Sequence, residues 1–161
     1  MSTIAIDGLR RCKKCQTLYR DSSSSKGFCP ADGGTHERSG LNYQLTFGIP
    51  TSDAQPAWRR CTKCEAIYFS GDRKGRCAAD PNAQAHHTPD DSRDLSIPHG
   101  RPETEHVQAG WEFCTKCNVL FYSRSTEPNM NHCTGGGEHA AHPDAFHFTL
   151  THGQPLPVRI D

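Results

Sequence analysis

The chain has 161 residues, a formal net charge of zero and a hydrophobic content of 34%, and it contains nine cysteines and ten histidines. With no net charge, no global electrostatic field attracts nucleic acid or an anionic membrane. No apolar run approaches the ~18–20 residues that a membrane span needs, so we expect a soluble protein.

The first residues, "MSTIAIDGLRRC", lack the basic start and the apolar stretch of a secretory signal. We therefore expect a cytoplasmic protein, or one exported without a recognisable cleavable signal. The charge is unevenly distributed: residues 1–50 hold seven Lys and Arg against four Asp and Glu, and residues 101–161 hold four against seven. We interpret this mild asymmetry as a solvated surface.

One pattern occurs three times along the chain. A Cys-x-x-Cys pair begins at Cys12, Cys61 and Cys114, so the repeat period is 49 and then 53 residues. In each copy a third cysteine, a histidine and an alternating apolar run follow. Such internal periodicity indicates repeated supersecondary units. We divide the chain into three repeats, at residues 1–50, 51–101 and 102–161.

Each repeat predicts three short strands. The segments "WRRC" and "AIYF" of the second copy flank a tight cysteine turn, which is typical of a β-hairpin. The runs at residues 43–48, 95–100 and 148–153 alternate and predict a third antiparallel strand. We find no convincing helix and expect a small all-β, metal-stabilised fold of three zinc-ribbon-like repeats. Because units that bury no face alone tend to stack, we favour a compact arrangement, with pseudo-threefold symmetry as one form, over beads on a string.

The cysteines can form disulfides or metal sites. Three per repeat leave one unpaired, and Cys-x-x-Cys is more common as a redox or metal element than as a structural bridge. Three cysteines and one histidine form a standard four-coordinate set for structural zinc, with no position open for substrate. We therefore expect about three structural zinc ions per chain.

The ligands follow from the spacing. His36 is the only histidine of the first repeat. In the third repeat the fourth ligand is His139, with His142 as the fallback and His132 disfavoured by its position next to a cysteine. In the second repeat His86 and His87 are equally placed. The candidate metal ligands are Cys12, Cys15, Cys29, His36, Cys61, Cys64, Cys77, His86, His87, Cys114, Cys117, Cys133 and His139.

Other matched positions carry less specific signals. A lysine precedes the second cysteine in each copy, where its charge would offset that of a thiolate-rich metal site. Matched aromatic residues are expected to form the small core of each unit. Adjacent strand residues point to opposite faces, so in "YF" and "FY" the outer members, Phe69 and Tyr122, are the candidate ligand-binding residues. We interpret His99, His106, His147 and His152 as ordinary surface or strand histidines.

The pattern W-x-x-C-x-K-C-x-x-[LI]-[YF], followed by C, G-G-x-H and a closing Y-x-L strand, covers nearly the whole chain. It resembles a tandem zinc-ribbon-like module of bacterial and fungal secreted or multidomain proteins. The first repeat has Leu9 in place of Trp, and the second lacks the Gly-Gly before its histidine. The resemblance implies metal binding and a repeat architecture, and it implies no reaction.

We find no phosphate loop, no nucleophile elbow and no H-E-x-x-H motif, and we predict that the protein is not an enzyme. The leading hypothesis is a zinc-binding interaction module for a glycan, a cell-surface component or a protein. The first alternative is nucleic-acid binding, favoured by "RRCKK" and "WRRCTK" and disfavoured by zero net charge. The second is a thiol redox protein or enzyme that uses the Cys-x-x-Cys pairs.

Overall fold

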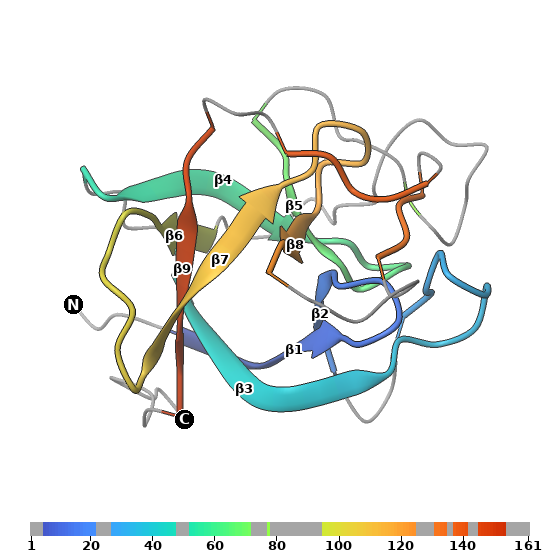
Figure 1. Cartoon of the computed structure of the whole chain (residues 1–161), viewed down its shortest axis with the longest axis horizontal. Coiled ribbons are helices and arrows are strands. Elements are labelled where there is room, and N and C mark those ends of the chain that lie inside the picture. The colour runs from blue at the N-terminus through green and yellow to red at the C-terminus, as the bar shows by residue number, and fades with distance from the viewer. Residues whose placement is uncertain are drawn as a thin grey trace.

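A computed structural model describes residues 5–21, 27–47, 52–71, 77, 95–124, 131–134, 137–141 and 145–153. The described residues form an all-β structure without a helix, as the sequence predicts (Figure 1). Accordingly, this part of the chain contains no helix long and apolar enough to cross a membrane. Each repeat supplies three strands. They are β1 (Ala5–Cys12), β2 (Leu18–Arg20), β3 (Arg38–Phe47), β4 (Ala54–Arg60), β5 (Ile67–Phe69), β6 (Leu95–Pro98), β7 (Val107–Phe113), β8 (Leu120–Tyr122) and β9 (Phe148–His152).

The first two strands of each repeat form the predicted hairpin. In the second repeat Trp58 pairs with Phe69, and in the third Trp111 pairs with Tyr122. The first strand also pairs with the closing strand of its own repeat, and this ladder shifts register at the same place each time. Beside these shifts Gly8, Ala57 and Gly110 have positive φ, the backbone conformation that allows a bulge. Each bulge bends the first strand of its repeat. The N-terminal end of that strand lies towards the centre of the sheet, and its C-terminal end leads into the cysteine turn.

The three closing strands meet one another in a cycle. Phe47 of β3 pairs with Leu95 of β6, and His99 after β6 pairs with Phe148 of β9. His152 of β9 pairs with Tyr43 of β3, which returns to the first repeat. Corresponding residues of the three repeats therefore make corresponding contacts. The nine strands of the described residues belong to one antiparallel sheet, and the cyclic pairing of the closing strands gives it pseudo-threefold symmetry.

A second cycle joins the hairpins at the other end of the repeats. Tyr19 pairs with Ala66, Tyr68 pairs with Val119, and Phe121 pairs with Thr17. Each of these bridges links one repeat to the next one around the axis. The cysteine turns of the three repeats are thereby gathered at one end of the molecule.

One hydrophobic core is shared by the three repeats. The sequence analysis predicts a separate small core in each unit, and this prediction is wrong. A single repeat provides too few apolar side chains to stabilise ~50 residues. Each repeat gives four fully or almost fully buried side chains to the common cluster, so the compact arrangement is confirmed. They are Leu9, Leu18, Tyr43 and Leu45, then Trp58, Ile67, Leu95 and Ile97, and finally Trp111, Leu120, Phe148 and Leu150.

Candidate metal centres

The cysteine pair of each repeat lies in a tight turn at the end of its hairpin. In the first repeat the Gln16 amide donates to the Cys12 carbonyl at 2.7 Å, and the Cys12 amide donates to the Thr17 carbonyl at 2.9 Å. The residue after the second cysteine has a left-handed backbone in all three turns, with φ of 68° at Gln16, 64° at Glu65 and 66° at Asn118. This closed turn directs both thiols of a pair towards one point.

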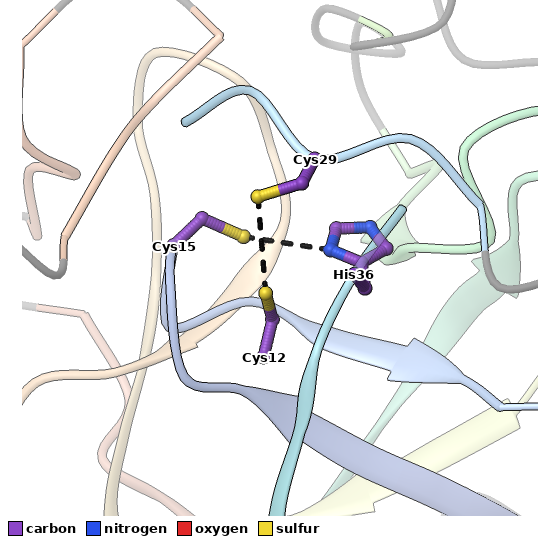
Figure 2. Close-up of side chains that lie close together, drawn as sticks. All are labelled: Cys12, Cys15, Cys29 and His36. Carbon is purple, nitrogen blue, oxygen red and sulfur yellow. Dashed lines mark hydrogen bonds between the residues drawn. The ribbon is translucent and has the colours of Figure 1, made fainter. Parts of the chain in front are cut away.

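The first centre is assembled from three segments of the first repeat (Figure 2). The Sγ atoms of Cys12 and Cys29 lie 3.8 Å apart, and the Sγ atom of Cys15 lies 3.6 Å from Nδ1 of His36. All four residues are buried, and their ligand atoms lie within 4.8 Å of one another. The structure therefore brings together the four residues that the spacing selects, in an arrangement that can hold a metal ion.

The third centre repeats this geometry. The Sγ atoms of Cys114 and Cys133 lie 3.7 Å apart, and the Sγ atom of Cys117 lies 3.5 Å from Nδ1 of His139. These four residues are also buried together. His139 thus occupies the place predicted for it, and His132 does not join the cluster among the described residues. The fallback residue, His142, lies outside the described residues.

The second centre is described for its three cysteines. Cys61, Cys64 and Cys77 are buried together, and the Sγ atoms of Cys61 and Cys77 lie 3.6 Å apart. The two candidates for the fourth ligand, His86 and His87, lie outside the described residues. All nine cysteines of the chain are described, and none forms a disulfide. The Sγ–Sγ distances of 3.8, 3.6 and 3.7 Å in the three centres are much longer than the sulfur–sulfur bond of a disulfide, which is about 2.0 Å.

The second ring nitrogen of each described ligand histidine, His36 and His139, reaches a neighbouring repeat. Nε2 of His36 lies 3.1 Å from the carbonyl oxygen of Cys64, and Nε2 of His139 lies 3.0 Å from that of Cys15. A carbonyl only accepts hydrogen bonds, so Nε2 must carry the proton. Nδ1 is then unprotonated and faces the thiols as a ligand atom. Such a hydrogen bond fixes the tautomer and the orientation of a ligating imidazole.

An aromatic ring stacks on each of these histidines. The ring of Tyr19 lies 4.5 Å from that of His36, and the ring of Phe121 lies 4.8 Å from that of His139, both nearly parallel. Tyr68 holds the same position in the second repeat and is fully buried beside the cysteines. In the first and third repeats the aromatic residue after the matched apolar position therefore supports the ligand histidine, a role that sequence reasoning missed.

The thiols differ in their tendency to ionise. Hydrogen bonds from Cys15 and Cys29 lower the pKa of Cys12, whereas burial raises the pKa of Cys15 well above its ordinary value. In the third repeat, hydrogen bonds from Cys117 and Cys133 likewise lower the pKa of Cys114. In these two centres the first cysteine is therefore the thiol that its neighbours stabilise most in the thiolate form. Metal binding must release the remaining protons, because thiolates are the ligating form.

The repeated lysine takes part in a local ion pair in the first repeat. Lys14 Nζ lies 2.8 Å from Oδ2 of Asp32, in the loop that carries Cys29. This hydrogen bond is the main cause of the raised pKa of Lys14, and the negative charges on Cys29 and Cys12 contribute less. The lysine therefore remains charged beside the thiolates, as expected of a residue that offsets their charge.

Phe69 and Tyr122 are not exposed platforms. Their neighbours Tyr68 and Phe121 do face the opposite side of the strand, as predicted, but Phe69 and Tyr122 are themselves partly buried against the shared core. Phe69 is half-buried against Trp58, with ring centroids 5.5 Å apart, and Arg11 lies over the ring of Tyr122 at 5.4 Å. The alternation of side chains along a strand shows which residues share a face of the strand. It does not show whether a neighbouring repeat covers that face. A binding role for these two residues stays a prediction.

The four other histidines predicted to be ordinary lie in strands or next to them. His99 stacks on Phe146 at 3.8 Å, and Nδ1 of His147 lies 2.8 Å from Oε1 of Glu112. His106 and His152 lie beside each other at the end of the third repeat. None of the four belongs to a described metal cluster.

Comparisons of the chain with protein-family models, with curated proteins and with solved structures found no match.

Proposed function

We propose that the protein is a non-enzymatic, zinc-stabilised scaffold whose three repeats together present a binding surface for a glycan or a protein. The observation that carries the zinc assignment is the spacing of the ligand atoms. With Zn–S of about 2.3 Å and Zn–N of about 2.0–2.1 Å, a tetrahedron separates two sulfurs by about 3.8 Å and sulfur from nitrogen by about 3.6 Å. The corresponding sulfur–sulfur distances here are 3.8, 3.6 and 3.7 Å, and the sulfur–nitrogen distances are 3.6 and 3.5 Å.

The closed nature of the centres supports a structural role over a catalytic one. Three thiolates and an imidazole fill all four positions of a tetrahedral ion, whereas catalytic zinc keeps one position for water or substrate. Beside His36 and His139 the described residues line a small pocket of about 10 Å³. A space of that size holds about one water molecule.

The burial of the thiols argues against the redox alternative. All nine cysteines are at most 6% exposed, whereas a redox-active Cys-x-x-Cys pair needs a thiolate that its partner can reach. Two of the basic residues that favour nucleic-acid binding are also engaged within the chain, because Lys13 lies 3.8 Å from Glu37 and Lys14 lies 2.8 Å from Asp32. A binding module for an uncharged or mixed surface fits the zero net charge better.

The zinc assignment is tested by elemental analysis of protein purified without chelator. About three zinc ions per chain are expected, because three clusters of buried cysteines are present and two of them include a histidine. Replacement with Co²⁺ should give the absorption of a tetrahedral thiolate complex. Chelation should unfold the whole chain in one transition, because site formation and folding are coupled and the core is shared. A folded, metal-free protein with nine titratable thiols would contradict the proposal.

A further inference from the structure

A cleft of about 170 Å³ is lined by residues of the third repeat together with Gly100 and Arg101 at the end of the second, and by none of the candidate metal ligands. Its floor is formed by strands β7 and β9, and its rim by the turns that carry Arg101 and Arg124. Glu112 and Thr149 point into it. Their strand neighbours Trp111 and Phe148 lie in the core, so these two side chains occupy the opposite face of the sheet.

Two buried polar atoms of this floor have no hydrogen-bond partner among the described residues. Glu112 is 9% exposed, and while its Oε1 atom lies 2.8 Å from Nδ1 of His147, its Oε2 atom has no partner. Thr149 is 2% exposed, and its hydroxyl likewise has none. Buried polar groups are almost always hydrogen-bonded, and each exception calls for an explanation. A carboxylate oxygen and a hydroxyl that share one cleft are suited to a ligand that donates hydrogen bonds.

The chemistry of this position is specific to the third repeat. Arg10 and Arg59 stand two residues before the first cysteine in the other repeats, where the third has Glu112. The symmetric scaffold is therefore built with a cation at this place in two repeats and an anion in the third. Pseudo-threefold packing alone does not require that reversal.

The charges around the cleft narrow the class of ligand. Arg101 donates two hydrogen bonds to Asp53, and Arg124 lies 3.8 Å from Glu103. Each guanidinium at the rim is paired with a carboxylate, so the charges of the rim largely cancel, and the Glu112 carboxylate disfavours a phosphate. Acceptors at the floor and donors at the rim together match groups that both donate and accept, as vicinal hydroxyls do.

We propose that the cleft between Glu112, Thr149 and the two arginines binds one sugar unit of a glycan. This inference rests on the binding function proposed above and gives that function a site. The cleft is smaller than the ~300–1,000 Å³ of drug-sized pockets, so it accommodates a single ring. For a ligand of about 12 heavy atoms, ordinary ligand efficiency gives a Kd on the order of 1 mM for the free sugar.

The test is a ligand-observed NMR titration of the full zinc-loaded chain. The probes are the methyl glycosides of glucose, galactose, mannose and N-acetylglucosamine, at up to about 20 mM, several times the expected Kd. Glycine and inorganic phosphate are the comparison ligands. At least one glycoside is expected to bind, and glycine and phosphate are expected not to compete with it.

Three variants locate the site. Glu112→Gln keeps the shape and removes the anionic acceptor, and Thr149→Val removes the hydroxyl. Each should weaken glycoside binding about tenfold or more, as expected when a site loses a group built to pair with a ligand hydroxyl. The matched control is Glu105→Gln, a carboxylate outside the cleft with an 88% exposed side chain, which should leave binding unchanged. Zinc content and urea midpoint, measured on every variant, show whether each one is folded.

The outcomes separate this inference from the proposed function. No binding by any glycoside to a folded, zinc-loaded chain overturns the sugar site and leaves the zinc assignment standing. Binding that survives both Glu112→Gln and Thr149→Val, or displacement by glycine or phosphate, also overturns it. A metal-free folded chain that binds a glycoside through Glu112 supports the cleft and contradicts the zinc scaffold.

Discussion

Nε2 of His139, in the third repeat, lies 3.0 Å from the backbone carbonyl oxygen of Cys15, in the first. The same contact joins His36 of the first repeat to the carbonyl of Cys64 in the second, at 3.1 Å. Each described ligand histidine thus faces the thiols of its own centre with Nδ1 and holds the cysteine turn of the next repeat with Nε2. The metal centres are therefore connected to one another by hydrogen bonds as well as by the shared core.

Replacing His139 by cysteine should separate these two tasks. His139→Cys keeps a fourth ligand, so zinc content should stay at about three per chain. The carbonyl of Cys15 loses its buried donor, and the free energy of unfolding should fall by about 1–3 kcal/mol. Elemental analysis and urea unfolding measure the two quantities. An unchanged urea midpoint would show that the contact between repeats contributes nothing to stability.

The fourth ligand of the second centre can be identified by the same relation. From the threefold correspondence we expect its Nε2 to donate to the carbonyl of Cys117 and its ring to stack on Tyr68. We expect one of the variants His86→Ala and His87→Ala to lose about one of three zinc ions, since a four-coordinate set then lacks a ligand. The other variant serves as the matched control. Full zinc content in both would place the fourth ligand elsewhere in the chain.

Much of this arrangement could be predicted from the sequence because it depends on local spacing. The Cys-x-x-Cys turn, its two flanking strands and the choice of His36 all follow from residues close together in one repeat. The threefold copy number made the metal interpretation stronger than a single motif would. His139 could be preferred over its neighbours on the same grounds.

The contacts between repeats could not be predicted in the same way. The acceptors of the histidine Nε2 atoms are backbone carbonyls, which carry no sequence signature. Phe69 was expected to be exposed because alternation places it opposite Tyr68, yet Phe113 of the next repeat lies 5.9 Å from its ring. His147 seemed ordinary because its partner, Glu112, is 35 residues away along the chain. Each of these features depends on how separate repeats face one another.

Gly27 tests how closely the first two repeats approach. Its φ is +68°, and a Cβ atom placed on it would lie 2.1 Å from the carbonyl oxygen of Cys64. Gly33 is the matched control, because its φ is +74° and a Cβ atom there would meet nothing within 4 Å. Gly33→Ala should cost only the left-handed backbone strain of about 1–2 kcal/mol. Gly27→Ala must also displace the backbone of the second repeat, and a total loss of about 4 kcal/mol or more is expected.

Urea unfolding of the two zinc-loaded variants gives the comparison directly. The difference between them isolates the contact, since both carry the same backbone strain. If Gly27→Ala and Gly33→Ala unfold at the same urea concentration, the two repeats do not pack as closely as the structure has them. Loss of zinc from Gly27→Ala alone would locate the disturbance at the neighbouring centres.

Each of the two tryptophans of the core donates a hydrogen bond to the glutamine that stands three residues before it. Nε1 of Trp58 donates to Oε1 of Gln55 at 2.9 Å, and Trp111 donates to Gln108 at 3.0 Å. In the first repeat Leu9 replaces the tryptophan, and an isoleucine stands at the glutamine position. An apolar side chain needs no acceptor, so the two positions change together within this one chain.

A double-mutant cycle on the second repeat tests that coupling. Gln55→Ile should lower the free energy of unfolding by about 1–3 kcal/mol, because the indole N–H loses its acceptor. Trp58→Leu should also destabilise the protein, by leaving a cavity in the shared core. In the Trp58→Leu background, however, Gln55→Ile should cost almost nothing, which gives a coupling of about 1 kcal/mol or more. Equal costs of Gln55→Ile in the two backgrounds would mean that the glutamine acts independently of the indole.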